Sequence, residues 1–127
     1  MTDFYHVDPA TVKASSELND WIAQEWMKWH LVRHYDSPCW TPEGGPLTGW
    51  QFVSDWFPST NPAHAGEARR KSKWCKIFAI DDRVAVTIEG SKCEVLYSET
   101  NGDKDRAEAL AICLAIVATL QAREDGI

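Results

Sequence analysis

The stretch WCKIFAIDDRVAVTIEGSKCEVLYS, residues 74–98, decides the fold class. Apolar residues alternate with polar or small ones in three runs: 74–80, 83–89 and 92–98. Alternation of period two is typical of strands whose sheet is covered on one face. Asp81-Asp82 and Gly90-Ser91 separate the runs, and turns this short join antiparallel neighbours. The stretch therefore predicts an antiparallel meander of three strands.

Helical patterns lie on both sides of this meander. Ser15 or Ser16 is a suitable N-cap for a first helix. Its apolar stripe recurs at helical spacing: Leu18, Trp21, Ile22, Trp26 and Trp29. A last helix follows Asp103, and from Ala107 to Leu120 it is apolar almost all round. Such a helix is covered on more than one side, so we expect it between the sheet and other elements or at a subunit interface.

The middle of the chain combines a loop, a short strand and a short helix. Residues 35–50 are rich in proline and glycine, which predicts a loop. Residues 51–57 are compatible with a fourth strand. Asn61 then caps a helix with Pro62 at its first position, where the missing N–H is not needed. That helix is expected to end near Ser72, because Gly66 weakens it.

These elements predict one α+β domain over residues 1–127. We expect a loose N-terminal arm over residues 1–15 and a globular core over residues 16–122. The core is predicted to be an antiparallel sheet of three to four strands packed with helices, as an α-β-α layered sandwich. The order of elements also matches a double-stranded RNA-binding domain. That domain grips phosphates with a lysine cluster at the start of its last helix, whereas residues 103–108 here, DKDRAE, carry mixed charge.

The net charge and the apolar content limit the classes of partner and the cellular location that we expect. The net charge is −6, and only residues 61–80 are basic, with one acid and five bases. Most of the acidic surface would repel a phosphate backbone, so duplex nucleic acid is not an expected partner. No segment approaches the roughly 20 apolar residues of a membrane span, and residues 1–6 do not resemble a signal peptide. We therefore expect a cytoplasmic protein with reduced, buried thiols and no metal or cofactor.

Two groups of residues are candidate binding residues. Seven tryptophans are many for one small core, and Trp40, Trp50 and Trp56 could stack on a base or anchor a partner. The alternative is that they fill the core. The second group comprises Ser59, Thr60 and Asn61 at a helix start, with Arg69, Arg70 and Lys71 at its far end. Free N–H groups at a helix start bind anions, but one monomer would not gather both ends of the helix around one phosphate. The preferred alternative is that Asn61 is a structural cap and that the basic residues favour the helix dipole.

His30, His34 and Cys39 raise the possibility of an enzyme or a metal site. Two histidines four residues apart share one face of a helix, and a nearby cysteine adds a third ligand. A fourth ligand is missing at any suggestive spacing. Cys39 as a nucleophile with His34 as base would also need an orienting acid and an oxyanion hole, which the sequence does not supply. A histidine pair at a helix end is the alternative.

The order of these motifs resembles the phage ABA-sandwich domain family. The resemblance rests on the helix Leu18–Trp29, a loop with tryptophan and proline, the phrase FPSTNPAHA at residues 57–65, and the last helix from Ala107. It covers about residues 16–120. It implies an α-β-α layered fold and a phage or prophage origin. The family has no established activity, so the resemblance implies no functional residues.

We therefore expect a non-enzymatic phage accessory protein, acting in the host cytoplasm and forming a homo-oligomer. It would block a host-defence component or sequester its nucleotide signal, so the partner is a host protein or a small nucleotide-like anion. An inhibitor of the anti-CRISPR kind, with a tryptophan-rich or acidic surface, is the first alternative. A small enzyme that uses His34, Cys39 or a metal is the second.

Overall fold

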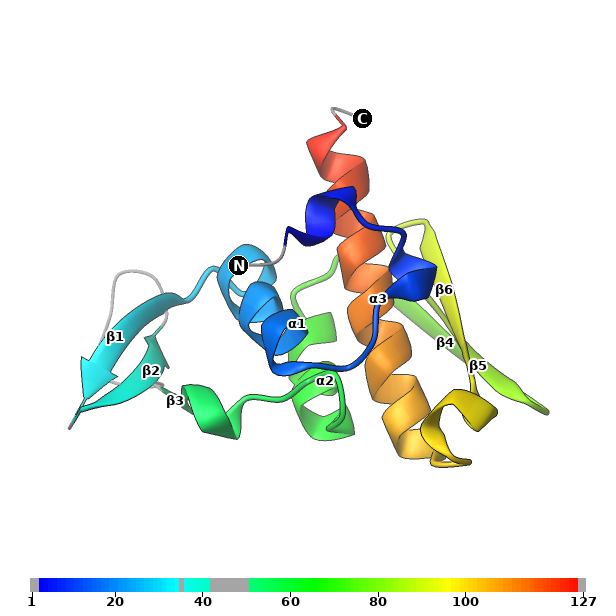
Figure 1. Ribbon diagram of the computed structural model, residues 1–127. Helices are drawn as coiled ribbons and strands as arrows, with labels where there is room; N and C mark the ends of the chain where they lie inside the picture. Colours follow the sequence, from blue (N-terminus) through cyan, green and yellow to red (C-terminus); the bar gives the residue numbers. More distant parts are fainter. Residues whose placement is uncertain (1–2, 35, 42–50, 126–127) are drawn as a thin grey trace.

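A central helix separates the predicted sheet from the other helices. The computed structural model describes residues 3–34, 36–41 and 51–125. Helix α3 (Lys104–Glu124) lies along one face of the antiparallel sheet β4-β5-β6, and helices α1 (Ser16–Trp21) and α2 (Pro62–Arg69) lie on the other side of α3 (Figure 1). The prediction of an α+β fold packed in layers is confirmed.

The meander is continuous and tightly turned. Its strands are β4 (Cys75–Ile80), β5 (Arg83–Ile88) and β6 (Ser91–Leu96). The register runs without a bulge from Cys75 opposite Ile88 to Ile80 opposite Arg83. Glu89 and Gly90 both have positive φ, +48° and +94°, as the two-residue turn between β5 and β6 requires. The predicted antiparallel meander is therefore confirmed, with its second turn at Glu89-Gly90 rather than at Gly90-Ser91.

Helix α3 is buried on several sides at once. Every residue from Ala109 to Val117 is buried, and the β4-β5-β6 sheet contributes Val84, Val86, Ile88 and Val95 to the same core. Helix α2 and two short 3₁₀ turns near the N-terminus, Phe4–His6 and Pro9–Thr11, also contact α3. The apolar helix thus lies between the sheet and other elements, which is the first of the two alternatives that its composition left open.

Helix α2 begins as predicted. The Asn61 side chain accepts hydrogen bonds from the backbone N–H groups of Ala63 and His64, at 2.8 and 3.2 Å, and Pro62 occupies the first helical position. Ala65 and Ala68 are fully buried. The Ala68 carbonyl accepts a hydrogen bond from the indole Nε1 of Trp26, which ties α2 to the first helical segment.

The first helix is shorter than predicted. Helix α1 continues as one π-helical turn, Ile22–Trp26, and Lys28 then adopts a positive φ of 61°, which ends the helix. The apolar stripe is buried as expected, apart from Trp29, which is partly buried beyond the helix end. His30 and His34 were expected at a helix end, which is wrong, because both belong to strand β1 (His30–His34).

A second, small sheet follows where a loop was predicted. Strands β1, β2 (Ser37–Thr41) and β3 (Gln51–Phe52) pair antiparallel in that order. The prediction of a loop is wrong for β2, because its backbone groups pair with β1, a segment that the helical pattern had absorbed. Residues 42–50 of the predicted loop lie outside the described residues. The predicted strand over residues 51–57 is reduced to β3, followed by a 3₁₀ turn.

The N-terminal segment packs on the core, so the description as a loose arm does not hold for its described part. It forms two 3₁₀ turns, Phe4–His6 and Pro9–Thr11, and Phe4 and Val12 are buried. The Gln121 side-chain amide of α3 donates to the carbonyls of Phe4 and Val7, at 2.8 and 2.6 Å. We call residues 3–14 the N-terminal segment below.

The expectation of buried thiols holds for Cys39 and Cys113, whereas Cys75 and Cys93 are partly exposed. All four cysteines are free, and burial raises the pKa of the Cys93 thiol to about 11. Within the described ranges, none of the helices combines the length and the apolar character that crossing a bilayer demands.

Gln121→Ala should release the N-terminal segment. The carbonyls of Phe4 and Val7 lose their hydrogen-bond donor. We therefore expect the free energy of unfolding, measured by urea titration, to decrease by about 1–3 kcal/mol. Hydrogen exchange of residues 4–12 should accelerate more than exchange in β5. Gln24→Ala, on the neighbouring π turn, is the control and should change neither quantity. Unchanged exchange in Gln121→Ala would show that the segment is held by other contacts.

Candidate functional site

A cavity of about 550 Å³ lies where three segments meet. These are residues 10–14 of the N-terminal segment, Ser59 and Thr60 before α2, and the region from Glu99 to Leu110 at the start of α3. Ligand pockets in proteins commonly measure 300–1,000 Å³. The cavity therefore has the size of a small-molecule site.

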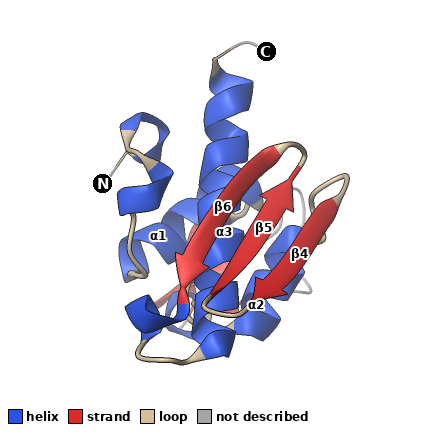
Figure 2. Ribbon diagram, turned by 90° about the vertical axis from the view of Figure 1, so that its right-hand side faces the viewer, coloured by secondary structure: helices blue, strands red, loops and turns tan. Residues whose placement is uncertain are grey.

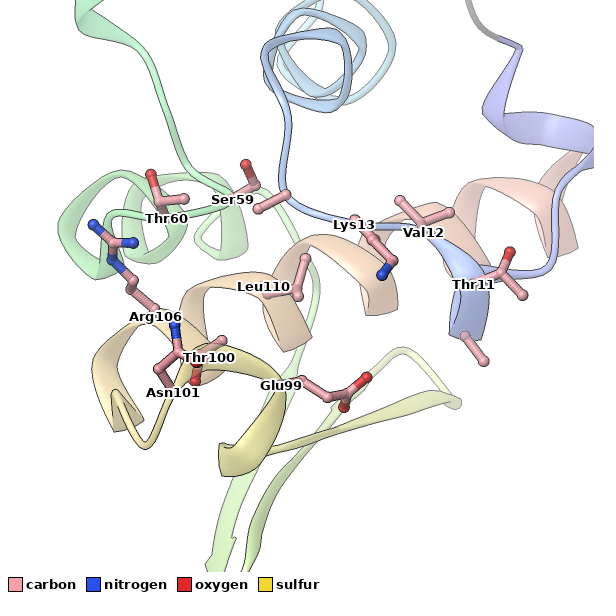
Figure 3. A pocket seen from close by; sticks show the side chains of 12 residues that line it. Thr11, Val12, Lys13, Ser59, Thr60, Glu99, Thr100, Asn101, Arg106 and Leu110 are labelled. Carbon is pink, nitrogen blue, oxygen red and sulfur yellow. The ribbon is translucent and has the colours of Figure 1, made fainter.

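The floor of the cavity is aliphatic and its sides are polar. Val12 and Leu110 are 9% and 8% exposed and supply the apolar surface. Figure 3 shows Lys13 and Arg106 on opposite sides of Leu110, each on a different segment. Hydroxyl and amide groups complete the lining: Thr11, Ser59, Thr60, Thr100 and Asn101.

A buried asparagine fixes the Ser59 side of the cavity. Asn19 of α1 is 7% exposed, and its Oδ1 accepts a hydrogen bond from the Ser59 backbone N–H at 2.9 Å. The Asn19 backbone carbonyl accepts from the indole Nε1 of Trp56 at 3.1 Å. Because a buried polar group without a partner is costly, these two bonds hold residues 56–59 against α1.

His64 supports the same stretch from α2. Its Nδ1 accepts a hydrogen bond from the Phe57 backbone N–H at 3.1 Å, and its ring stacks on Trp56 with centroids 5.4 Å apart. Burial lowers the pKa of His64 below its ordinary value, against the opposing effect of nearby Glu67 and Asp55. The neutral ring is the form that can accept the bond.

The start of α3 forms the opposite side. Asp103 caps the helix by accepting from the Arg106 backbone N–H, and its other oxygen lies 3.6 Å from the Arg106 Nε. Asn101 adopts the left-handed conformation with φ of 54°, and Thr100 donates its hydroxyl to the Asp103 carbonyl at 2.7 Å. These local bonds place Arg106 and Asn101 beside each other at the cavity.

The charges at the cavity favour an anion. Lys13 and Arg106 supply two cations. Glu99 is the acid among the lining residues, and its Oε2 accepts a hydrogen bond from the Leu96 backbone N–H at 2.8 Å. The side chain of Arg106 is 62% exposed, so its pairing with Asp103 is weak and leaves donors free for a ligand. In a chain of net charge −6, this lining is locally cationic.

The candidate tryptophans lie in the core where the structure describes them. Trp40 and Trp56 are 2% and 1% exposed, so they fill space rather than face a ligand. Trp50 lies outside the described residues. Among the tryptophans that the structure describes, Trp74 is exposed, at 45%, next to β4. Its ring has the Lys76 ammonium 5.8 Å from its centroid.

The second candidate group is divided between the two ends of α2. Ser59 and Thr60 line the cavity, whereas the Asn61 side chain is occupied by the cap of α2. Arg69, Arg70 and Lys71 lie at the opposite end of the helix, about 12 Å away at 1.5 Å per residue. The structure therefore brings Ser59 and Thr60 together with Arg106 and Lys13, not with the basic run.

The enzyme hypothesis depends on His30, His34 and Cys39, and the parts of these residues that the structure describes do not form a reactive group. Cys39 is fully buried in β2, and its Sγ lies 3.6 Å from the Ser37 carbonyl. His30 is exposed in β1, and its Cα lies four strand positions, or about 13 Å, from the Cα of His34. Over residues 3–34, 36–41 and 51–125, no group of three or more potential metal ligands occurs.

Sequence reasoning missed Lys13, Asn101 and Arg106 as cavity residues. The left-handed turn at Asn101 and the cap at Asp103 are local features, and neither signals a cavity. Residues 10–14 reach the cavity because the N-terminal segment docks on α3 through Gln121. No local sequence pattern signals that long-range contact.

Comparison with known proteins identifies no relative, because no family model, no curated protein and no solved structure matches the chain. The resemblance to the phage ABA-sandwich domain family therefore stays a prediction.

The protonation of His64 should make stability depend on pH. The folded chain holds the pKa of His64 below the ordinary 6.5, so the unfolded chain binds more protons as the pH falls through that value. We expect the free energy of unfolding to decrease from about pH 7.5 to about pH 5.5, by less than about 1.4 kcal/mol per pH unit. In His64→Gln this part of the slope should disappear. Equal slopes in both proteins would contradict the assignment.

Proposed function

We propose that the chain is a non-enzymatic binding module that holds a small nucleotide-like anion in the cavity beside Ser59 and Arg106. The observation that carries the proposal is the pair of cations, Lys13 and Arg106, on opposite sides of an aliphatic floor. In an acidic chain, a local cationic lining concentrates anions at that place.

Each part of the cavity suits one part of such a ligand. The Arg106 guanidinium can donate two parallel hydrogen bonds to a phosphate, and the Lys13 ammonium can neutralise a second charge. The Asn101 amide offers hydrogen bonds to a sugar or to the edge of a base. The hydroxyls of Thr11 and Thr60 donate to the carbonyls of Asp8 and Phe57, so toward a ligand they act as acceptors. Val12 and Leu110 offer aliphatic contact to a ring, so the base would lie on side-chain carbons rather than on a tryptophan.

The structural roles of the neighbouring groups favour binding over chemistry. Thr100, Asp103 and Glu99 are engaged in local hydrogen bonds that shape the turn and cap the helix. The remaining lining groups, above all Lys13 and Arg106, are suited to hold and orient an anion. Sequestration requires no more than this, because a tight binder lowers the free ligand concentration by mass action.

The biological setting follows from the resemblance to phage proteins. A phage or prophage protein in the host cytoplasm that binds a small nucleotide would remove a signal on which host defence depends. This role needs neither a cofactor nor a metal. It also explains why a small acidic domain would carry a cationic cavity.

Calorimetric titration with linear and cyclic nucleotides tests the proposal. We expect at least one nucleotide to bind and to raise the melting temperature, with a stabilisation of ~2.7 kcal/mol at a free concentration of 100 times Kd. Arg106→Gln should weaken binding by ~1.5–3 kcal/mol, since it removes charged hydrogen bonds.

Arg70→Gln is the matched control. It removes the same charge from an exposed arginine at the far end of α2, so it should leave the affinity unchanged. Equal losses in both variants would place the ligand elsewhere or show a general charge effect. Failure of every nucleotide to bind would contradict the proposal.

A further inference from the structure

The outer edge of β4 is open. In the sheet order β4-β5-β6, β5 pairs on both sides, whereas β4 and β6 are the edges. The 3₁₀ turn Pro9–Thr11 contacts β6. Figure 2 shows β4 as the outermost strand, and the described residues supply no strand to its free edge.

β4 also lacks the features that usually protect an edge. Its six residues, CKIFAI, contain no proline, and their pairing with β5 has no bulge. Phe78 and Ile80 are 59% and 52% exposed, and Lys76 is the one charge within the strand. A regular, apolar edge of this kind is a template for another strand.

The hydrogen-bonding direction of each β4 residue can be assigned. The Trp74 carbonyl accepts from the Glu89 backbone N–H, and Ile80 closes the two-residue turn with Arg83. Even-numbered residues of β4 therefore direct their N–H and C=O groups to β5. The backbone groups of Cys75, Ile77 and Ala79 consequently face outward.

The ends of β4 carry opposite charges. Lys73 precedes the strand and Asp81 follows it, and no acid occurs between Ala68 and Ile80. Antiparallel pairing of two identical strands places the start of one beside the end of the other, so these charges attract. Parallel pairing would bring like charges together.

From these observations we infer that β4 pairs antiparallel with β4 of a second copy, about a two-fold axis at Ile77. This register matches all outward backbone groups, because Cys75 lies opposite Ala79 of the second copy and Ile77 opposite Ile77. On the outer face it places Trp74 opposite Ile80 of the second copy. Lys73 then lies opposite the second copy's Asp81. The two meanders become one six-stranded sheet.

Sedimentation velocity under reducing conditions tests this dimer. The wild type should change with concentration from 14.4 kDa to twice that mass. Ala79→Pro removes an outward N–H from an exposed position in each copy, so dimerisation should weaken at least about tenfold. Lys92→Pro is the matched control, since its N–H faces away from β5 on the opposite edge, and it should stay dimeric.

Exchanging the charges at the two ends of β4 tests the register without a proline substitution. Asp81→Lys should weaken the dimer by about two- to fivefold, and adding Lys73→Glu should restore it. Circular dichroism and thermal unfolding verify that each variant folds. A chain that stays monomeric to millimolar concentration, a dimer that a folded Ala79→Pro leaves intact, or a charge pair without restoration would overturn the proposal. A monomer that adds an acidic peptide along β4 would assign the edge to a different occupant and would also overturn it.

Discussion

The burial of α3 is the constraint on which the rest of the structure depends. A helix that is apolar from Ala109 to Val117 has no face to leave in water, and each large side chain such as Ile112 gains about 1.5–3 kcal/mol on burial. One sheet can cover only one side. Helix α2 and the N-terminal segment therefore have to pack around the same helix, and the cavity lies where they meet over its first turns.

The polar contacts of the core then determine the shape of that cavity. Asn19 holds Ser59 through its amide oxygen, and Gln121 holds the N-terminal segment that carries Lys13. Both amides join segments that are far apart in sequence. The cap of α3 at Asp103 supplies the third side by placing Arg106. A ligand in the cavity would thus contact three segments, each held in place by its own hydrogen bonds.

Local patterns predicted the fold better than the site. Alternation in β4 to β6 and the cap at Asn61 are properties of neighbouring residues, and the structure confirms both. The helix end at Lys28 has no proline or glycine to signal it, so β1 was mistaken for helix. Lys13 and Arg106 lie on opposite sides of the cavity although they are far apart in the sequence, and only tertiary packing determines that arrangement.

Chemical-shift mapping by NMR would locate the bound ligand, using the nucleotide that stabilises the chain most. Backbone amides of residues 11–14, Ser59, Thr60, Asn101 and Arg106 should shift together along one binding curve. Amides of residues 69–73, at the other end of α2, should stay in place. Shifts confined to that basic run, or no shifts at all, would contradict binding in the cavity over the start of α3.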